Sequence, residues 1–259
     1  EMFNVFSLAA LAEATQAPTR ARLGTVLSQR HTGFTLVLEN CRKENIAVIA
    51  RSAECLGVGR LHLVHSQTER AEARYGFGRL SPTEKQAKLS RLSKSATDWL
   101  ELHEHASMRA CVECLRDSGT ECVVATTPAV QGALSLYEPS DWPLRHTAIL
   151  LGSEAAGLSN EALALADMRV TIPQRGMTQS LNVAQCAALV IGEVLRRRSI
   201  SDAGEILYSA DEQRAAASAL LPADGAALRL HNKAFSKAVR TRGQLGGTEG
   251  EYFGYLTEG

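Results

Sequence analysis

The sequence predicts an α/β protein built on a mostly parallel sheet with helices on both faces. Short runs rich in aliphatic and β-branched residues alternate with helical segments along most of the chain, which is typical of such a sheet. The 259 residues are 45% hydrophobic and 22% charged, which is enough apolar material for one core of this kind. No apolar run reaches the roughly 18 residues that a transmembrane helix needs, so we expect no membrane partner.

The elements of this domain can be placed in order along the chain. The expected strands are 34–39, 60–65, 121–126, 147–151 and 168–172. The expected helices lie near 45–56, 84–92, 105–116 and 181–198, with one more that starts near Ser159. Asn45 is a natural N-cap for the first of these helices.

The two ends of the chain differ in character from the middle, which divides the chain into three parts. Residues 1–31 are rich in Ala and Leu and predict an N-terminal helical extension. Residues 32–200 contain the alternating strands and helices of the α/β domain. Residues 201–259 predict a C-terminal helical extension, with helices near 201–221 and 224–240 and a Gly-rich tail.

The charge of the chain is balanced, with 28 basic and 28 acidic side chains, although an RNA-binding protein usually has a basic surface. The basic residues are nevertheless clustered, and each cluster is either a solvated helix face or a set of phosphate contacts. The clusters are Arg20, Arg22, Arg30 and His31; Arg196, Arg197 and Arg198; and Arg229, Lys233, Lys237, Arg240 and Arg242.

The six cysteines are scattered through predicted helices and strands, unlike those of a small secreted disulfide scaffold. Residues 1–17 also lack the basic segment and the continuous apolar core of a secretory signal. We therefore expect a soluble intracellular protein, in the cytoplasm or in an organelle. Cys111 and Cys114 form one C-x-x-C, without a second pair or a suitable histidine pair near it in the sequence. Free buried thiols and no metal site are expected.

Three polar segments follow predicted strands, where parallel sheets bind their ligands. The first contains Asn45 and Arg51, whose spacing is close to two helical turns; taken alone, it is a helix cap and a surface arginine. The second, GSEAAGLS at 152–159, could be only a glycine turn with an exposed Glu154. Residues 57–59 (GVG) precede a strand instead of following one, which excludes a nicotinamide-binding Rossmann fingerprint.

The third segment, IPQRGMTQSLNV at 172–183, runs from a strand into a long apolar helix. A Ser180 cap explains the start of that helix. It leaves Asn182 unexplained, because Asn is a weak helix former inside a first turn.

In this order, the three segments resemble the motifs of the SpoU/TrmH family of RNA 2′-O-methyltransferases in the SPOUT superfamily. The first resembles N…N-x-x-x-x-x-R, the second G-x-E-x-x-G-[LV]-S and the third I-P-x-x-G-x-x-x-S-L-N-V. The resemblance spans residues 34–193, and the N-terminal helical segment looks like that of the tRNA-specific branch.

The resemblance implies a parallel α/β sheet whose C-terminal part forms a trefoil knot, in a homodimer joined through the helix after Ser180. It implies S-adenosylmethionine as the cofactor. The cofactor-binding positions carried over by motif are Thr126, Gly152, Ile172 and Leu181. The catalytic positions are Arg51, Asn45, Glu154, Ser180 and Asn182.

The reaction implied is methyl transfer to a ribose 2′-hydroxyl of RNA. Arg51 matches the arginine that family mechanisms make the proton acceptor. A guanidinium stays protonated far above neutral pH, so we favour Arg51 as the cation that stabilises the developing alkoxide. Glu154 is then expected to pair with Arg51 and to fix its orientation.

The substrate expected from the resemblance is a tRNA guanosine. The first alternative is an enzyme of ribosomal RNA, which is less favoured because the fused N-terminal RNA-binding domain of ribosomal relatives is absent. The second alternative is a catalytically silent dimer that binds RNA and keeps only the fold.

Overall fold

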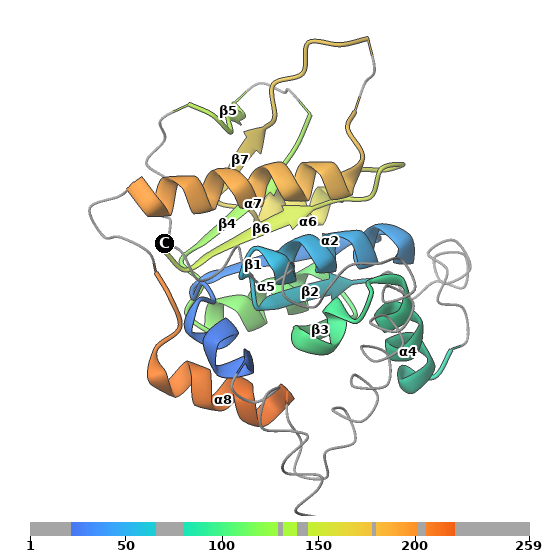
Figure 1. Cartoon of the computed structure of the whole chain (residues 1–259). Helices are drawn as coiled ribbons and strands as arrows, with labels where there is room; N and C mark the ends of the chain where they lie inside the picture. The colour runs from blue at the N-terminus through green and yellow to red at the C-terminus, as the bar shows by residue number, and fades with distance from the viewer. Residues whose placement is uncertain are drawn as a thin grey trace, which may run out of the picture.

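The computed structural model describes residues 22–65, 80–128, 132–138, 145–177, 180–200 and 206–220. They contain a seven-stranded sheet, all of whose strand pairs are parallel, in the order β3-β2-β1-β6-β4-β7-β5 (Figure 1). The strands are β1 (Phe34–Glu39), β2 (Arg60–Val64), β3 (Glu101–His105), β4 (Cys122–Thr126), β5 (Leu134–Ser135), β6 (Thr147–Leu151) and β7 (Met168–Thr171).

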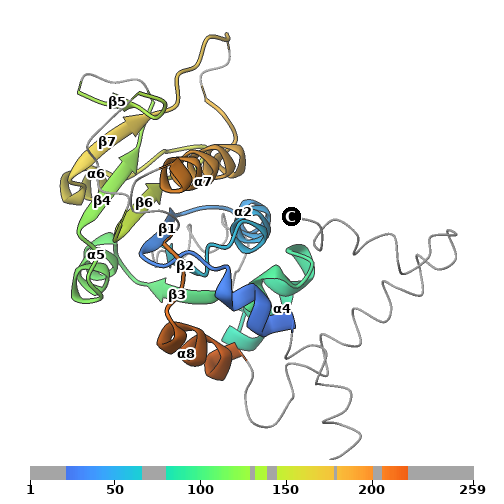
Figure 2. The same ribbon diagram turned by 60° about the vertical axis from the view of Figure 1, so that its left-hand side comes forward.

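Helices cover both faces of this sheet (Figure 2). The named helices of the described residues are α2 (Lys43–Cys55), α4 (Pro82–Leu92), η1 (Ala96–Trp99), α5 (Met108–Asp117), α6 (Asn160–Leu165), α7 (Val183–Ile200) and α8 (Ala210–Leu220). Because alternate residues of a strand face opposite sides, β1 contributes Leu36 and Leu38 to the cluster under α2 and α7. Val37 joins the cluster under α5 and α6. The predicted α/β fold with two covered faces is confirmed.

The five predicted strands are present, and two further strands were missed. β3 (ELHEH) is an edge strand that pairs only with β2 among the described residues, and it has one aliphatic side chain, so it lacks an apolar signal. β5 has only two residues.

Helix boundaries differ from the prediction at two candidate site residues. Arg42 is the N-cap residue of α2, so Asn45 lies inside the first turn and is not its N-cap. Helix α7 begins at Val183, so Asn182 precedes that helix instead of lying within it.

The segments that flank the domain pack on each other where they are described. Residues 22–28 are helical, and Leu23 and Leu27 contact Ala216 of α8. Backbone hydrogen bonds tie this pair to the domain, for example from the Thr32 N–H to the Ile206 carbonyl at 2.9 Å. The helix expected at 224–240 lies outside the described residues. No helix in the described part of the chain is long and apolar enough to cross a membrane.

Two of the three arginines that end α7 have a structural role. The sequence had predicted either a solvated helix face or phosphate contacts for them. Arg198 is fully buried and donates to the carbonyls of Thr32 and Gly33 at 2.8 and 3.0 Å. Arg197 is 10% exposed and pairs with Glu193 at 2.8 Å. These two guanidiniums therefore hold the end of α7 to the domain and are not available to RNA phosphates.

Candidate active site

Three of the predicted catalytic residues meet beyond the carboxyl ends of the strands. Asn45 comes from the first turn of α2, Glu154 from the turn after β6 and Asn182 from the residue before α7. The Asn182 amide donates to Asn45 Oδ1 at 3.2 Å and makes a short hydrogen bond to Glu154 Oε1. Sequence segments that lie up to 137 positions apart are thus joined by one side chain.

The orientation of Asn182 is fixed by the backbone of α7. Its Oδ1 accepts the N–H of Ala184 at 2.8 Å, so Asn182 caps the helix. With its oxygen bound in this way, its NH₂ group must point toward Asn45 and Glu154. The cap explains why an Asn stands at this position, which a Ser180 cap did not.

A tight turn positions Glu154. The Gly157 N–H donates to the Ser153 carbonyl at 2.8 Å, and the Ala156 N–H donates to Ser153 Oγ at 3.2 Å. The backbone of Gly152, at the start of this turn, lies so close to that of Gly157 that a Cβ on Gly152 would be 2.1 Å from the carbonyl carbon of Gly157. Only glycine fits such an approach, which gives Gly152 a structural role in addition to its predicted role.

The four predicted cofactor-binding residues lie along the same edge of the sheet. Thr126 ends β4, Gly152 follows β6, and Ile172 follows β7. These three strands are neighbours in the order β6-β4-β7, and Leu181 lies beside Asn182 before α7. The Thr126 hydroxyl donates to the Leu150 carbonyl at 2.7 Å, which joins β4 to β6 near their ends.

Two further threonines at this edge were not predicted. The hydroxyl oxygens of Thr127, which follows β4, and Thr171, which ends β7, are buried and have no hydrogen-bond partner among the described residues. A buried hydroxyl without a partner is unfavourable, so these two groups fit a polar ligand better than an apolar surface.

Cys41 is another neighbour of the site that sequence reasoning missed. It follows β1, is fully buried, and its thiol lies 3.9 Å from the Gly152 carbonyl oxygen. Burial, with the nearby charges of Glu154 and Glu39, raises its pKa to about 12. The thiol therefore stays protonated at neutral pH and is not an activated nucleophile.

Arg51 and Ser180 stand outside this network. Arg51 lies six residues after Asn45, about 9 Å along the helix and about 240° around it, so the two residues do not share a face. Arg51 is exposed and lines a groove between α2 and α7 that includes Ala188. The predicted Arg51–Glu154 pair is absent from the described residues, where Glu154 binds Asn182 instead. Ser180 is exposed, two positions before Asn182.

Comparison with known proteins identifies the family. The model of the SpoU rRNA Methylase family matches residues 33–192, which is more than half of the chain. The chain belongs to this family. The match contains Asn45, Arg51 and Glu154, as well as Ser180 and Asn182. The resemblance on which these residues were predicted is therefore confirmed.

Named relatives of this SpoU family chain include a tRNA (guanosine(18)-2′-O)-methyltransferase of Thermus thermophilus. It is 33% identical over 187 residues, which cover 72% of this chain and 86% of the relative. Among solved structures, the A. aeolicus TrmH/SpoU tRNA modifying enzyme has a TM-score of 0.63 at 19% identity, covering 80% of this chain and 96% of its own. That likeness establishes the fold.

A second solved structure is the SpoU methyltransferase AviRb from Streptomyces viridochromogenes in complex with the cofactor AdoMet. Its TM-score is 0.52 at 26% identity, and the match covers 68% of the present chain and 64% of AviRb. AdoMet is thus a ligand of a relative that shares this fold.

Proposed function

We propose that this protein transfers a methyl group from S-adenosylmethionine to the ribose 2′-hydroxyl of a tRNA guanosine. The observation that carries the proposal is the Asn45–Asn182–Glu154 network, which joins residues of all three motif segments at one edge of the sheet. The tRNA guanosine methyltransferase from Thermus thermophilus, which matches 72% of this chain, supports the choice of substrate.

The residues at this edge fit the cofactor. The hydroxyls of Thr127 and Thr171, which have no partner in the described part of the chain, flank the ends of β4 and β7, and the Gly152 turn allows close backbone approach. We propose that Thr126, Gly152, Ile172 and Leu181 hold S-adenosylmethionine there. The trefoil knot is proposed from the membership of the SpoU family. The proposed domain comprises residues 32–200, between extensions 1–31 and 201–259.

The proposed mechanism assigns positioning to the network and charge stabilisation to Arg51. Bound S-adenosylmethionine supplies an electrophilic methyl group on its sulfonium sulfur. Glu154 accepts a hydrogen bond from Asn182 through Oε1, which leaves its second oxygen to accept a hydrogen bond from the ribose hydroxyl and then its proton. Asn182 holds that carboxylate in place and is itself held by Asn45, while Ser180, two positions before Asn182, contributes a hydroxyl. Methyl transfer then requires in-line alignment of the oxygen, the methyl carbon and the sulfur.

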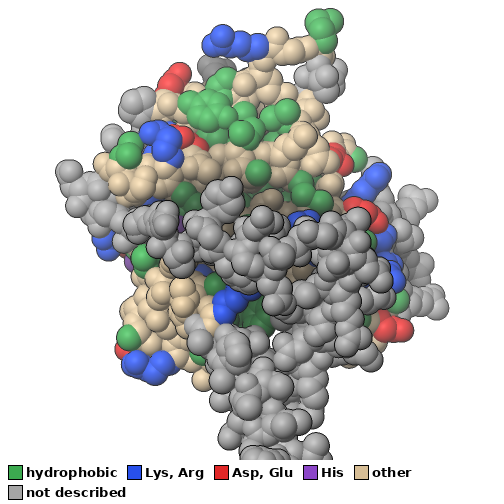
Figure 3. All heavy atoms as spheres, in the orientation of Figure 1, with side chains coloured by type: hydrophobic (Ala, Val, Ile, Leu, Met, Phe, Trp, Pro, Cys, Tyr) green, Lys and Arg blue, Asp and Glu red, His purple; other side chains and the backbone are tan. Residues whose placement is uncertain are grey.

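Arg51 does not contact this network within one chain, so the proposal brings it to the developing alkoxide in a homodimer, which also gives it a dry environment. Arg51 lies among apolar side chains in the α2–α7 groove, where Val48 is 53% and Leu56 40% exposed; Leu189 of α7 is also 40% exposed. Figure 3 shows hydrophobic side chains on the face of the molecule that carries α7. A second copy packed on this face would remove water from around the guanidinium and strengthen its attraction for an oxyanion.

The first experiment tests the activity and the substrate. Purified protein is incubated with labelled S-adenosylmethionine and with total RNA, and the methylated nucleotide is mapped. A 2′-O-methylguanosine in tRNA is expected. A product in ribosomal RNA would favour the first alternative, whereas binding of tRNA without any methyl transfer would favour the silent dimer.

The second experiment tests Arg51. Arg51→Ala should lower the methyl-transfer rate by at least about 100-fold, as loss of one oxyanion-stabilising group does elsewhere. The folded state and the dimer, measured by circular dichroism and sedimentation, should be unchanged. Arg109→Ala is the matched control, because Arg109 is an exposed arginine on α5 whose pair with Glu161 is 3.6 Å long. Unchanged turnover in Arg51→Ala would remove Arg51 from the mechanism.

A further inference from the structure

A cluster of histidines and cysteines lies away from the candidate active site, on the α5 face of the sheet. In β2, Leu61 and Leu63 pack toward α2 and α7, so the alternation of the strand turns His62 toward α5. β3 pairs with β2 in parallel register and places His103 opposite His62 and His105 opposite Val64. Cys111 faces the same region from α5. Three elements thus direct nitrogen and sulfur ligands into one space.

The ligand atoms of three of these residues are close enough to share one ion. One atom each of His62, His105 and Cys111 lies within 4.8 Å of the others. A tetrahedral zinc ion holds nitrogen and sulfur ligands about 3.3–3.8 Å apart, so shifts of about 1 Å would complete the geometry. The rings of His62 and His105 are already nearly parallel, at 9°, and a hydrogen bond of 2.9 Å joins His62 Nδ1 and His105 Nε2.

The hydrogen bonding of His62 is incomplete without a ligand. Its side chain is only 3% exposed, and its Nε2 has no hydrogen-bond partner among the described residues. A buried ring nitrogen without a partner is unfavourable, and such groups in native proteins call for an explanation such as a bound ion. A bound cation would take up the lone pairs that the His62–His105 contact leaves unused.

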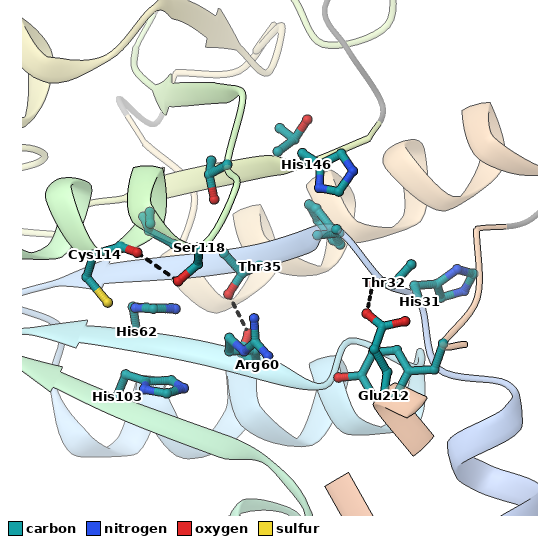
Figure 4. A pocket seen from close by; sticks show the side chains of 16 residues that line it. His31, Thr32, Thr35, Arg60, His62, His103, Cys114, Ser118, His146 and Glu212 are labelled. Atoms are coloured by element: carbon teal, nitrogen blue, oxygen red, sulfur yellow. Dashed lines mark hydrogen bonds between the residues drawn. The ribbon is translucent and has the colours of Figure 1, made fainter. Parts of the chain in front are cut away.

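Cys114 lies next to these three residues, and its sulfur, which is not among the atoms within 4.8 Å of one another, would have to move to become a fourth ligand. It lies one helical turn after Cys111 on α5, so both side chains project from one side of that helix. Cys114 lines a cavity of about 440 Å³ together with His62 and His103. Figure 4 shows its sulfur directed toward the His62 ring, while the Ser118 hydroxyl binds its carbonyl behind it. Both cysteines are free thiols.

We propose that His62, His105, Cys111 and Cys114 form a structural zinc site. Two imidazoles and two thiolates are a common tetrahedral set for Zn²⁺, whereas hard ions such as Mg²⁺ prefer oxygen ligands. The four protein ligands close the coordination sphere, and the site lies on the opposite face of the sheet from α2 and α7. The ion therefore acts by tying the edge strand β3 to β2 and α5. This differs from the expectation of no metal site, which rested on the spacing of residues along the chain.

The test uses the full chain, purified under reducing conditions. We expect about one zinc ion per chain by elemental analysis, as one closed tetrahedral site requires. After removal of zinc by a chelator, Co²⁺ should give the near-ultraviolet charge-transfer band of a cobalt–thiolate bond and the visible bands of tetrahedral cobalt. Zn²⁺ should displace Co²⁺ and should raise Tm, because a ligand that binds the folded state stabilises it.

Variants assign the ligands. Cys111→Ser and His105→Asn should each weaken zinc binding by more than about 100-fold, because even changes behind a metal ligand cost about 10- to 100-fold. Cys114→Ser should reduce the thiolate band and keep weaker binding. The matched control is Cys122→Ser, which alters another buried free cysteine, on β4. This control should bind zinc as the unaltered chain does.

The outcomes decide the proposal. It is overturned by an unaltered chain that gives no cobalt–thiolate band, or by Cys111→Ser and His105→Asn variants that keep the full band. It is also overturned by a Cys122→Ser variant that loses zinc to the same extent as Cys111→Ser. Circular dichroism identifies any variant that does not fold, and His105→Asn then replaces Cys111→Ser, because His105 is only partly buried.

Discussion

The turn after β6 offers a sharp test of how backbone geometry supports the proposed site. In Gly152→Ala, the new Cβ would lie 2.1 Å from the Gly157 carbonyl carbon and 2.3 Å from the Leu158 nitrogen. Ordinary van der Waals contact starts at 3.4 Å, and backbone atoms cannot rotate away as a flexible side chain can. The two sides of the turn must therefore separate by about 1 Å, a shift of the kind that overpacking imposes.

The size of the effect follows from what this separation breaks. Overpacking of this kind costs about 1–3 kcal/mol. Loss of the 2.8 Å hydrogen bond from the Gly157 N–H to the Ser153 carbonyl adds about 1 kcal/mol. The expected loss is thus about 2–4 kcal/mol from a domain stability of about 5–15 kcal/mol. Glu154 moves with the turn, and a misplacement of about 1 Å can lower the rate of methyl transfer by about 100-fold.

Urea denaturation followed by circular dichroism measures the stability, and methylation of tRNA measures the rate per folded molecule. The control is Gly119→Ala, where φ is +88° and an added Cβ meets nothing within 4 Å. That variant should lose only the roughly 1–2 kcal/mol of a left-handed residue and should keep its methylation rate. The reasoning is refuted if Gly152→Ala is as stable and as active as Gly119→Ala.

Three further changes test other parts of the structure. Asn182→Asp sets a second carboxylate beside Glu154, so the methylation rate should fall by about 100-fold, while the helix cap survives; a rate near that of the unaltered chain contradicts this. In Arg198→Lys, the ammonium group cannot donate to both backbone carbonyls as the planar guanidinium does. Urea denaturation should detect a loss of about 2–3 kcal/mol in the free energy of unfolding. Hydrogen bonds from Arg196, which has the largest effect, and from Arg197 lower the pKa of Glu193 to about 2. The stability that Glu193 contributes is therefore present above about pH 4.3 and is lost as the pH falls toward 2. The difference in unfolding free energy between Glu193→Gln and the unaltered chain should shrink over that range, and a constant difference would contradict the role of the carboxylate.

The apolar strands and the site segments were predictable because their signals are local. The run 147–151 is buried at every position, and a fully buried strand can be recognised from its continuous run of apolar residues. The motif segments could be located because they follow such strands. Their meeting at one edge could also be expected, since the carboxyl ends of parallel strands share an edge.

The partners of the site residues were not predictable, because they depend on helix phase and on exact helix ends. Asn45 and Arg51 are separated by about 240° on α2, so the spacing does not place them on one face. Asn182 binds Glu154 because α7 begins two residues later than predicted, at Val183, which leaves the Asn182 side chain to cap the helix. A shift of two residues in that boundary changes the partner of a carboxylate in the site.

Buried cations escaped prediction for a related reason. A run of three arginines at a helix end usually lies in solvent or contacts phosphate, and nothing in the run itself separates Arg196 from Arg198. The difference arises from rotation around α7, which leaves Arg196 56% exposed and turns Arg198 into the domain over the Phe34 ring. The carbonyls that Arg198 satisfies belong to Thr32 and Gly33, which are far away in the sequence.

The proposed zinc site shows what one missed strand conceals. If 101–105 is not recognised as a strand, its pairing with β2 is unknown, and the sequence does not predict that His105 lies near His62. Once β3 is paired in parallel with β2, the period of two puts His103 and His105 on the same face as His62. Cys111 follows from α5, which covers that face. A metal site whose ligands come from adjacent strands thus has no fixed spacing in the sequence, and the C-x-x-C becomes informative only when the strand beside it is known.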